Sequence, residues 1–198
     1  DLPGEQRGLI PNAKFYDKPY RGSWNGLTVI SISIGQGEIL ATPLQIANLG
    51  ATIAYRGHFI TPHIVKEIQD EQLDSLYRVP RKTSIDRKHY EDVVTGMRAA
   101  VTGGTCRVAG AILPDVEVCG KTGTAQINAN EPNHALFVSF APYSNPEISV
   151  TVQIPNGYTS SNAAELASNV YKYYYDKNSR KKLLNKKVSS PTIGTVHD

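Results

Sequence analysis

Alternating apolar and polar residues mark the second half of the chain. The alternation is clean over residues 147–154 and also runs through residues 134–141, which predicts two β-strands. Residues 142–146 separate them and carry an Asn-Pro turn signal, a length typical of an antiparallel hairpin. A third strand is predicted over residues 116–122. The apolar positions are Leu136, Val138 and Phe140 in the strand over 134–141, and Ile148, Val150, Val152 and Ile154 in the strand over 147–154.

A helical pattern begins near residue 42. Thr42 and Gln45 have the spacing of a capping box, and Pro43 occupies the first helical position. The helix is predicted to run to about Tyr55. Its apolar residues lie on more than one side, which is typical of a buried helix.

Two further helices are predicted later in the chain. Residues 86–101 carry one apolar stripe at helical spacing, and Gly103 and Gly104 follow as a stop signal. The last helix is predicted to begin near Asn162. Its apolar face is expected to hold Ala163, Leu166, Ala167, Val170, Tyr171 and Tyr174. Helices combined with an antiparallel sheet indicate an α+β fold, with the sheet packed against helices.

The first part of the chain is less regular. The first 40 residues are rich in glycine, proline and aromatic residues, and predict irregular loops that pack against another surface. Residues 28–34 alternate in part and are predicted to form a short strand. Residues 59–68 and 76–79 are predicted to be extended, as a hairpin around a charged stretch.

The composition is that of one globular domain with a tail. The 198 residues are 40% hydrophobic and 20% charged, and no run approaches the roughly 18 apolar residues of a membrane-spanning helix. The net charge of +3 is uneven, because residues 177–198 hold six lysines and arginines against one aspartate. We therefore predict a nearly neutral body over residues 1–176 and a basic, disordered tail over residues 177–198. A neutral body gives no reason to expect a nucleic-acid partner.

The two cysteines and the histidines show no metal-binding pattern. Cys106 and Cys119 lie 13 residues apart without a CxxC motif, so they are either core thiols or one incidental disulfide. His58 and His63 lie in a connecting segment without carboxylate or thiolate partners. We expect no metal and no cofactor.

The segment from Gly120 to Gln126, at the end of a predicted strand, carries the candidate chemistry. Lys121 supplies an ammonium group, while Thr122 and Thr124 supply hydroxyls on one side of an extended chain. Gly123 lets a ligand approach the backbone closely. These groups suit a carboxylate that lies beside a reacting carbonyl, and a backbone N–H there can serve in an oxyanion hole.

Lys-Thr-Gly is one of three elements in the signature of penicillin-binding proteins and serine β-lactamases. The others are a Ser-x-x-Lys element, which holds the nucleophile, and a Ser-x-Asn type element. Residues 179–182 and 160–162 match these two by letter, but both follow the Lys-Thr-Gly strand. They are better interpreted as part of the basic tail and as the cap of the last helix. We therefore expect no catalytic nucleophile in this chain.

Several ordered motifs give the chain a specific resemblance. It resembles the C-terminal half of a class B penicillin-binding protein transpeptidase domain, closest to the elongation type, penicillin-binding protein 2. The resemblance covers most of residues 1–175. It rests on residues 1–5 (DLPGE), 8–11 (GLIP), 24–26 (WNG), 34–38 (IGQGE), 42–45 (TPLQ), 61–63 (TPH), 121–126 (KTGTAQ) and 134–142 (HALFVSFAP).

The resemblance implies a function and roles for individual residues. Members of this family are membrane-anchored enzymes on the periplasmic side that cross-link peptidoglycan stem peptides and are acylated by β-lactams. Lys121, Thr122, Gly123 and Thr124 would form the site for the substrate carboxylate, and the Thr124 N–H would be one half of the oxyanion hole. Cell-wall synthesis proteins would be the partners. The nucleophilic serine and its lysine would lie upstream, so we expect this chain alone to be inactive.

Two other functions remain open at this point. A serine β-lactamase or D,D-carboxypeptidase uses the same kind of site and turns over its acyl-enzyme with water. A non-catalytic module that binds β-lactams or peptidoglycan as a sensor keeps the site without the chemistry. A Ser-x-x-Lys element upstream of this chain would favour an enzyme over a sensor.

Overall fold

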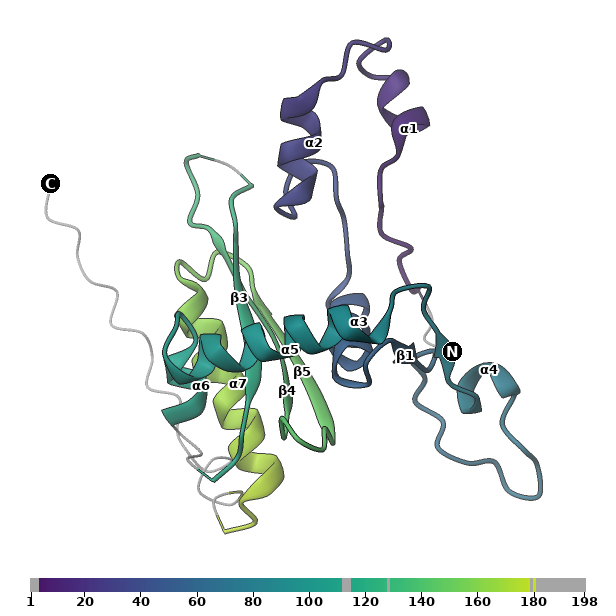
Figure 1. Cartoon of the computed structure of the whole chain (residues 1–198), viewed down its shortest axis with the longest axis vertical. Helices are drawn as coiled ribbons and strands as arrows, with labels where there is room; N and C mark the ends of the chain where they lie inside the picture. Colours follow the sequence, from purple (N-terminus) through teal and green to yellow (C-terminus); the bar gives the residue numbers. More distant parts are fainter. Residues whose placement is uncertain (1–3, 112–114, 128, 179, 181–198) are drawn as a thin grey trace, which may run out of the picture.

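A computed structural model describes residues 4–111, 115–127, 129–178 and 180. At its centre is an antiparallel sheet of the strands β3 (Cys119–Ala125), β4 (His134–Ala141) and β5 (Ile148–Ile154), in the order β3-β4-β5 (Figure 1). Helices pack on this sheet, which confirms the α+β class. The predicted β4–β5 hairpin is also confirmed, with Phe137 opposite Val152 in its register.

One face of the sheet is covered by the long C-terminal helix α7 (Ser160–Tyr175). Its Tyr171 is fully buried, and the Tyr171 hydroxyl donates to Ser139 Oγ at 2.9 Å. Ser139 Oγ donates in turn to the Val150 carbonyl at 3.0 Å. These polar groups satisfy one another within an apolar cluster that includes Phe137.

The opposite face is covered by α3 (Pro43–Ala54). The predicted capping box is present, because the side chains of Thr42 and Gln45 each bond the other's backbone N–H. Gly50 lets this helix approach the sheet closely, since a Cβ there would lie 2.7 Å from Ser149 Oγ. Leu49 is 56% exposed, so the prediction of burial on all sides is wrong, since only one side of the helix meets the sheet.

A second cluster joins the two helices on this side of the sheet. Helix α5 (Arg87–Thr102) begins at the cap Asp86 and ends at Gly103, as predicted within one residue. The apolar face of α5 contributes Val94 and Met97 to a buried cluster with Cys119 and Phe140. Helix α6 (Arg107–Ala111) follows and packs on α7.

The N-terminal arm, residues 5–40, projects away from the sheet (Figure 1). It holds α1 (Ala13–Asp17) and α2 (Gly26–Ser33), and a backbone bridge between Leu9 and Leu40 closes its base. Between α3 and α5, β1 (His58–Phe59) pairs with β2 (Arg81–Lys82), and α4 (Ser75–Arg78) lies between these strands.

Two strand predictions are wrong because a side chain caps a helix instead. Residues 28–34 lie largely in α2, which starts where the Asn25 side chain accepts from the Leu27 N–H. Residues 76–78 lie in α4, which starts where Asp74 accepts from the Leu76 N–H. Short apolar runs fit both periods, and the cap decides between them.

Two boundaries also differ from the predictions. The strand predicted over 116–122 is shifted to 119–125, and the last helix begins two residues early because Thr159, not residues 160–162, provides the cap. Leu166 and Val170 are exposed on that helix, while Ala164 and Ser168 are buried. These small residues allow α7 to lie close to the sheet. The Tyr171 ring is fully buried at the same helix–sheet contact.

Candidate functional site

The candidate site lies along β3, which is an edge strand of the sheet in the described part of the chain. Its Lys121 and Thr124 side chains are exposed, Gly123 is half-buried, and Thr122 retains only 8% exposure. The strand therefore begins in the core at Cys119 and emerges at the surface within five residues. This emergence is what presents the Lys-Thr-Gly segment to a ligand.

The pleat of β3 divides the candidate residues between two faces. Thr122 lies opposite Phe137 and Thr124 opposite Ala135, so the two threonines share one face, as their spacing predicts. Lys121 and Gly123 lie on the other face. The long lysine side chain returns to the strand, where its Nζ donates to the Thr122 carbonyl at 2.7 Å.

Alternate carbonyl groups of this segment receive side-chain donors. The Val118 carbonyl accepts from an Arg98 guanidinium nitrogen at 3.1 Å, and the Gly120 carbonyl accepts from Cys106 Sγ at 3.8 Å. With the Thr122 carbonyl and Lys121, these bonds form a row along one side of the strand. Ladder carbonyls would be occupied by β4, so the row marks the open edge of β3.

The row of carbonyl groups also indicates the direction of the next backbone N–H on that side, which is the N–H of Thr124. In an antiparallel strand the N–H and C=O of one residue point to the same side, and residues two apart repeat that direction. The Thr124 N–H therefore points to the open edge, just beyond the Thr122 carbonyl and the Lys121 ammonium group. A donor placed there beside a fixed positive charge suits an oxyanion.

Two glycines in the segment have different roles. A Cβ on Gly120 would lie 2.4 Å from the Phe137 ring, so glycine is required there for packing. A Cβ on Gly123 would meet only Leu136, at an ordinary 3.4 Å. Packing therefore does not require glycine at 123, and the absent side chain leaves the backbone open to a ligand.

One contact of the site was missed from the sequence. Thr105 Oγ1, in the loop between α5 and α6, lies 3.1 Å from Thr122 Oγ1. Residues 105 and 122 are far apart in sequence, and no motif links them. The contact exists because α5 packs against β3 and delivers its C-terminal loop beside the strand.

The cysteines near the strand are not nucleophiles. Both are free and fully buried, which leaves the core-thiol alternative and removes the disulfide. Burial raises the pKa of the Cys119 thiol to about 12, despite the nearby Arg98 and Arg56 guanidinium groups. A thiol that stays protonated at neutral pH does not attack a carbonyl.

Of the two sequence matches to serine elements, the one over residues 160–162 belongs to the start of the last helix. Ser160 and Ser161 lie in the first turn of α7, where the Ser161 N–H donates to Thr159 Oγ1. Ser179 and Lys182 lie outside the described residues. Among the described residues, no group of three or more His, Cys, Asp or Glu is placed to hold a metal ion.

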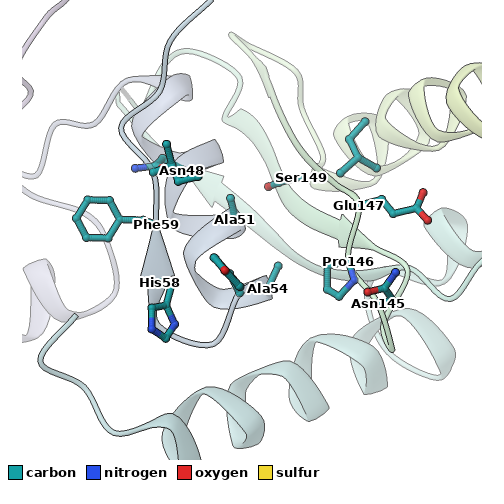
Figure 2. A pocket seen from close by; sticks show the side chains of 12 residues that line it. Asn48, Ala51, Ala54, His58, Phe59, Asn145, Pro146, Glu147 and Ser149 are labelled. Carbon is teal, nitrogen blue, oxygen red and sulfur yellow. The ribbon is translucent and has the colours of Figure 1, made fainter. Parts of the chain in front are cut away.

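A separate hollow of about 380 Å³ lies between α3, β1 and the start of β5 (Figure 2). It is bounded by Ala51 of α3, Phe59 of β1 and Pro146 of the β4–β5 turn. Its lining is mostly apolar and includes no residue of β3. The groups suited to acyl chemistry are therefore those along β3.

None of the described helices is long and apolar enough to cross a membrane.

Comparison with known proteins identifies the family of this chain. The family model of the penicillin binding protein transpeptidase domain matches residues 1–172. A peptidoglycan D,D-transpeptidase MrdA of Acinetobacter baumannii is 35% identical over 192 residues, which cover 88% of this chain and 28% of that relative. The chain therefore spans less than a third of the length of this curated relative.

Solved structures show the same similarity. The structure of Pseudomonas aeruginosa PBP2 in complex with WCK 5153 matches with a TM-score of 0.79 at 36% identity, over 90% of this chain and 40% of that one. The structure of Helicobacter pylori PBP2 with MreC matches with a TM-score of 0.73 at 28% identity, over 87% of this chain and 32% of that one.

Proposed function

This chain belongs to the penicillin-binding protein transpeptidase domain family, and from that premise we propose that it forms the substrate-binding wall of a peptidoglycan D,D-transpeptidase. The observation that carries the proposal is the exposed Lys-Thr-Gly segment on the edge strand β3, where the Lys121 Nζ donates to the Thr122 carbonyl. The rest of the enzyme, including the nucleophile, belongs to the part of the parent protein that precedes this chain.

The proposed reaction is acyl transfer in two steps. A serine from the upstream part attacks the carbonyl that joins the last two D-alanines of a stem peptide, and the terminal D-alanine leaves with a proton on its amine. An amine of a neighbouring strand then attacks the serine ester and takes the acyl group, and the serine regains its proton. β-Lactams enter the first step as substrate mimics.

Each group of β3 has a role in this scheme. The Thr124 N–H donates to the oxyanion of the tetrahedral intermediate, a contact worth ~3 kcal/mol of barrier. The Thr122 and Thr124 hydroxyls bind the substrate carboxylate, and Lys121 keeps the site electropositive. Gly123 leaves space for the peptide backbone to lie beside β3.

The setting of the parent protein is part of the same proposal. We assign it to the periplasmic side of the bacterial inner membrane, held there by an upstream anchor. Its partners would be other cell-wall synthesis proteins. The neighbouring Helicobacter pylori structure, which contains MreC, supports this class of partner.

Labelling with a fluorescent penicillin tests the function. We expect stoichiometric labelling of the parent protein and none of the 198-residue chain alone, because the proposed nucleophilic serine lies upstream of this chain. Rapid hydrolysis of the antibiotic by the parent would favour a β-lactamase instead. Absence of a Ser-x-x-Lys element upstream, with no labelling, would favour the sensor module.

A proline variant tests the oxyanion donor. Thr124→Pro removes the N–H and is compatible with the strand if that N–H points to the open edge. We expect the acylation rate of the parent to fall by about 100-fold or more, the usual cost of losing one such donor. Thr124→Ser keeps the N–H and the hydroxyl and is the matched control. Equal acylation of the Pro and Ser variants would refute the assigned donor.

A further inference from the structure

The loop between α5 and α6 reaches the candidate site through a pair of hydroxyl groups. Thr105 Oγ1 and Thr122 Oγ1 lie 3.1 Å apart, a hydrogen bond that either atom can donate. Thr105 is exposed, whereas Thr122 is nearly buried. A surface residue outside the Lys-Thr-Gly segment therefore controls one of the hydroxyls within it.

This loop is a rigid support for Thr105. The Cys106 N–H donates to the Ala100 carbonyl at 2.9 Å, which ties the loop to the end of α5. A Cβ on Gly104 would lie 2.9 Å from the Ala100 Cα, so only glycine fits this close approach. On the other side, the fully buried Cys106 donates to the Gly120 carbonyl. Thr105 thus lies between two residues whose positions are fixed.

The direction of this hydrogen bond decides whether Thr122 can bind a carboxylate. A carboxylate is only an acceptor, so Thr122 can bind it only by donating its single proton. The Thr122 proton is free to bind the carboxylate when Thr105 donates to Thr122. It is already engaged with Thr105 when Thr122 is the donor. The first arrangement also polarises the Thr122 hydroxyl, because consecutive hydrogen bonds strengthen one another.

We propose that Thr105 is a positioning residue of the substrate site: it donates to Thr122 and so directs the Thr122 proton toward the substrate carboxylate. This inference rests on the proposed acyl-transfer function. Thr105 touches neither the reacting carbonyl nor the nucleophile, and its effect passes through Thr122. It therefore matters for ligands that carry the carboxylate and not for those that lack it.

Acylation of the parent protein by a penicillin and by its methyl ester tests the proposal. Thr105→Val keeps the shape of the side chain and removes the hydroxyl. We expect it to slow acylation by the free acid by about tenfold, the scale of one lost hydrogen bond to a charged ligand, and to leave the rate with the ester within about twofold. Thr105→Ser should restore the rate with the free acid.

Thr102→Val is the matched control, because the Thr102 hydroxyl bonds only carbonyls of its own helix. Equal slowing with acid and ester in Thr105→Val would overturn the proposal, since it would show general damage to the site. An unchanged rate with the acid would overturn it as well.

Hydrogen exchange in the 198-residue chain separates this proposal from the proposed function. We expect Thr105→Val to speed exchange of the amides of residues 121 and 123, which face β4, by several-fold and to leave the amides of α7 unchanged. Unchanged exchange at residues 121 and 123 would contradict the positioning of Thr122 by Thr105. An unlabelled wild-type parent would refute the acyl-transfer function, while faster exchange at 121 and 123 would still support the positioning contact.

Discussion

The sheet and the N-terminal arm are both rich in apolar residues, but the arm leaves most of its aliphatic side chains exposed. In the sheet, Phe137 and Phe140 are fully buried. In the arm, α2 has no buried residue, and its Leu27 and Ile30 are 74% and 60% exposed. An apolar sequence therefore does not guarantee burial; it requires a second surface that closes over it.

The two regions also differ in what holds them together. The sheet lies between α7 on one face and α3 with α5 on the other, so its side chains pack from both sides. The arm relies on a local polar network, in which Tyr16 and Tyr20 both donate to Glu38. The Trp24 indole donates to Asp17 nearby. We expect the sheet to respond to changes in volume and the arm to respond to changes in charge.

A large-to-small change in the sheet should have the largest effect. Phe137→Ala removes a fully buried ring between α7 and the sheet, and should lower the free energy of unfolding by about 3–5 kcal/mol. Ile30→Ala in the exposed α2 should change it by no more than about 0.5 kcal/mol. Urea denaturation monitored by circular dichroism measures both. Similar losses in the two variants would remove the contrast between the regions.

Adding one methyl group within the site strand should have the next largest effect. Gly120→Ala places a Cβ against the Phe137 ring, which the packed core holds in place, and should cost about 1–3 kcal/mol. Gly96→Ala in α5 is the control, since nothing lies within 4 Å of its Cβ position. Alanine is the better helix former, so that variant should gain about 0.5–1 kcal/mol. Thermal unfolding should therefore show a lower Tm for Gly120→Ala and a higher Tm for Gly96→Ala.

Loss of a buried hydroxyl should cost less. Tyr171→Phe keeps the ring in the core and removes the bond to Ser139, so we expect a loss of about 0.5–1.5 kcal/mol. Tyr174→Phe, at a position that is 43% exposed, should be nearly neutral. Equal values from chemical denaturation would show that the Tyr171–Ser139 bond adds nothing to packing.

The arm should show the smallest effect, and only as a function of pH. Hydrogen bonding from Tyr16 lowers the pKa of Glu38 below its ordinary value of 4.5. The stabilisation is therefore present above that value and is lost as the pH falls through the lowered pKa. Burial and Glu38 raise the pKa of Tyr16 to about 12, so its contribution is present below pH 10 and is lost toward pH 12.

Fluorescence of Trp24, the one tryptophan of the chain, reports on this network because its ring lies 6.2 Å from that of Tyr16. We expect an acid transition below pH 4.5 that is absent in Glu38→Gln. Glu165→Gln, an exposed change on α7, should retain the transition. A transition that persists in Glu38→Gln would show that another group controls the arm.

The sequence predicted the sheet and the site strand better than the arm. The alternation over β4 and β5, which is clean in β5, and the cap at Thr42 are local signals that survive folding unchanged. The same reasoning failed at residues 28–34, because a short segment with four apolar residues in seven fits a strand and a helix equally well until a cap such as Asn25 is considered.

The candidate site was predicted in part. The Lys-Thr-Gly segment and its place at a strand end were visible from residue types, and so was the shared face of Thr122 and Thr124. The contact with Thr105 was not, because it depends on the packing of α5 against β3. The row of carbonyls at the open edge likewise depends on side chains from α5 and from the loop that follows it.

The sequence by itself determined most of the local elements, the family and the residues that carry the candidate chemistry, since periodicity, caps and motifs are properties of short segments. Only the tertiary structure decided which apolar surfaces are buried, which strand forms the edge of the sheet and which side chains reach the carbonyls of β3. These features depend on residues distant in the chain, because the burial and the hydrogen bonds of a segment are determined by the residues that pack against it.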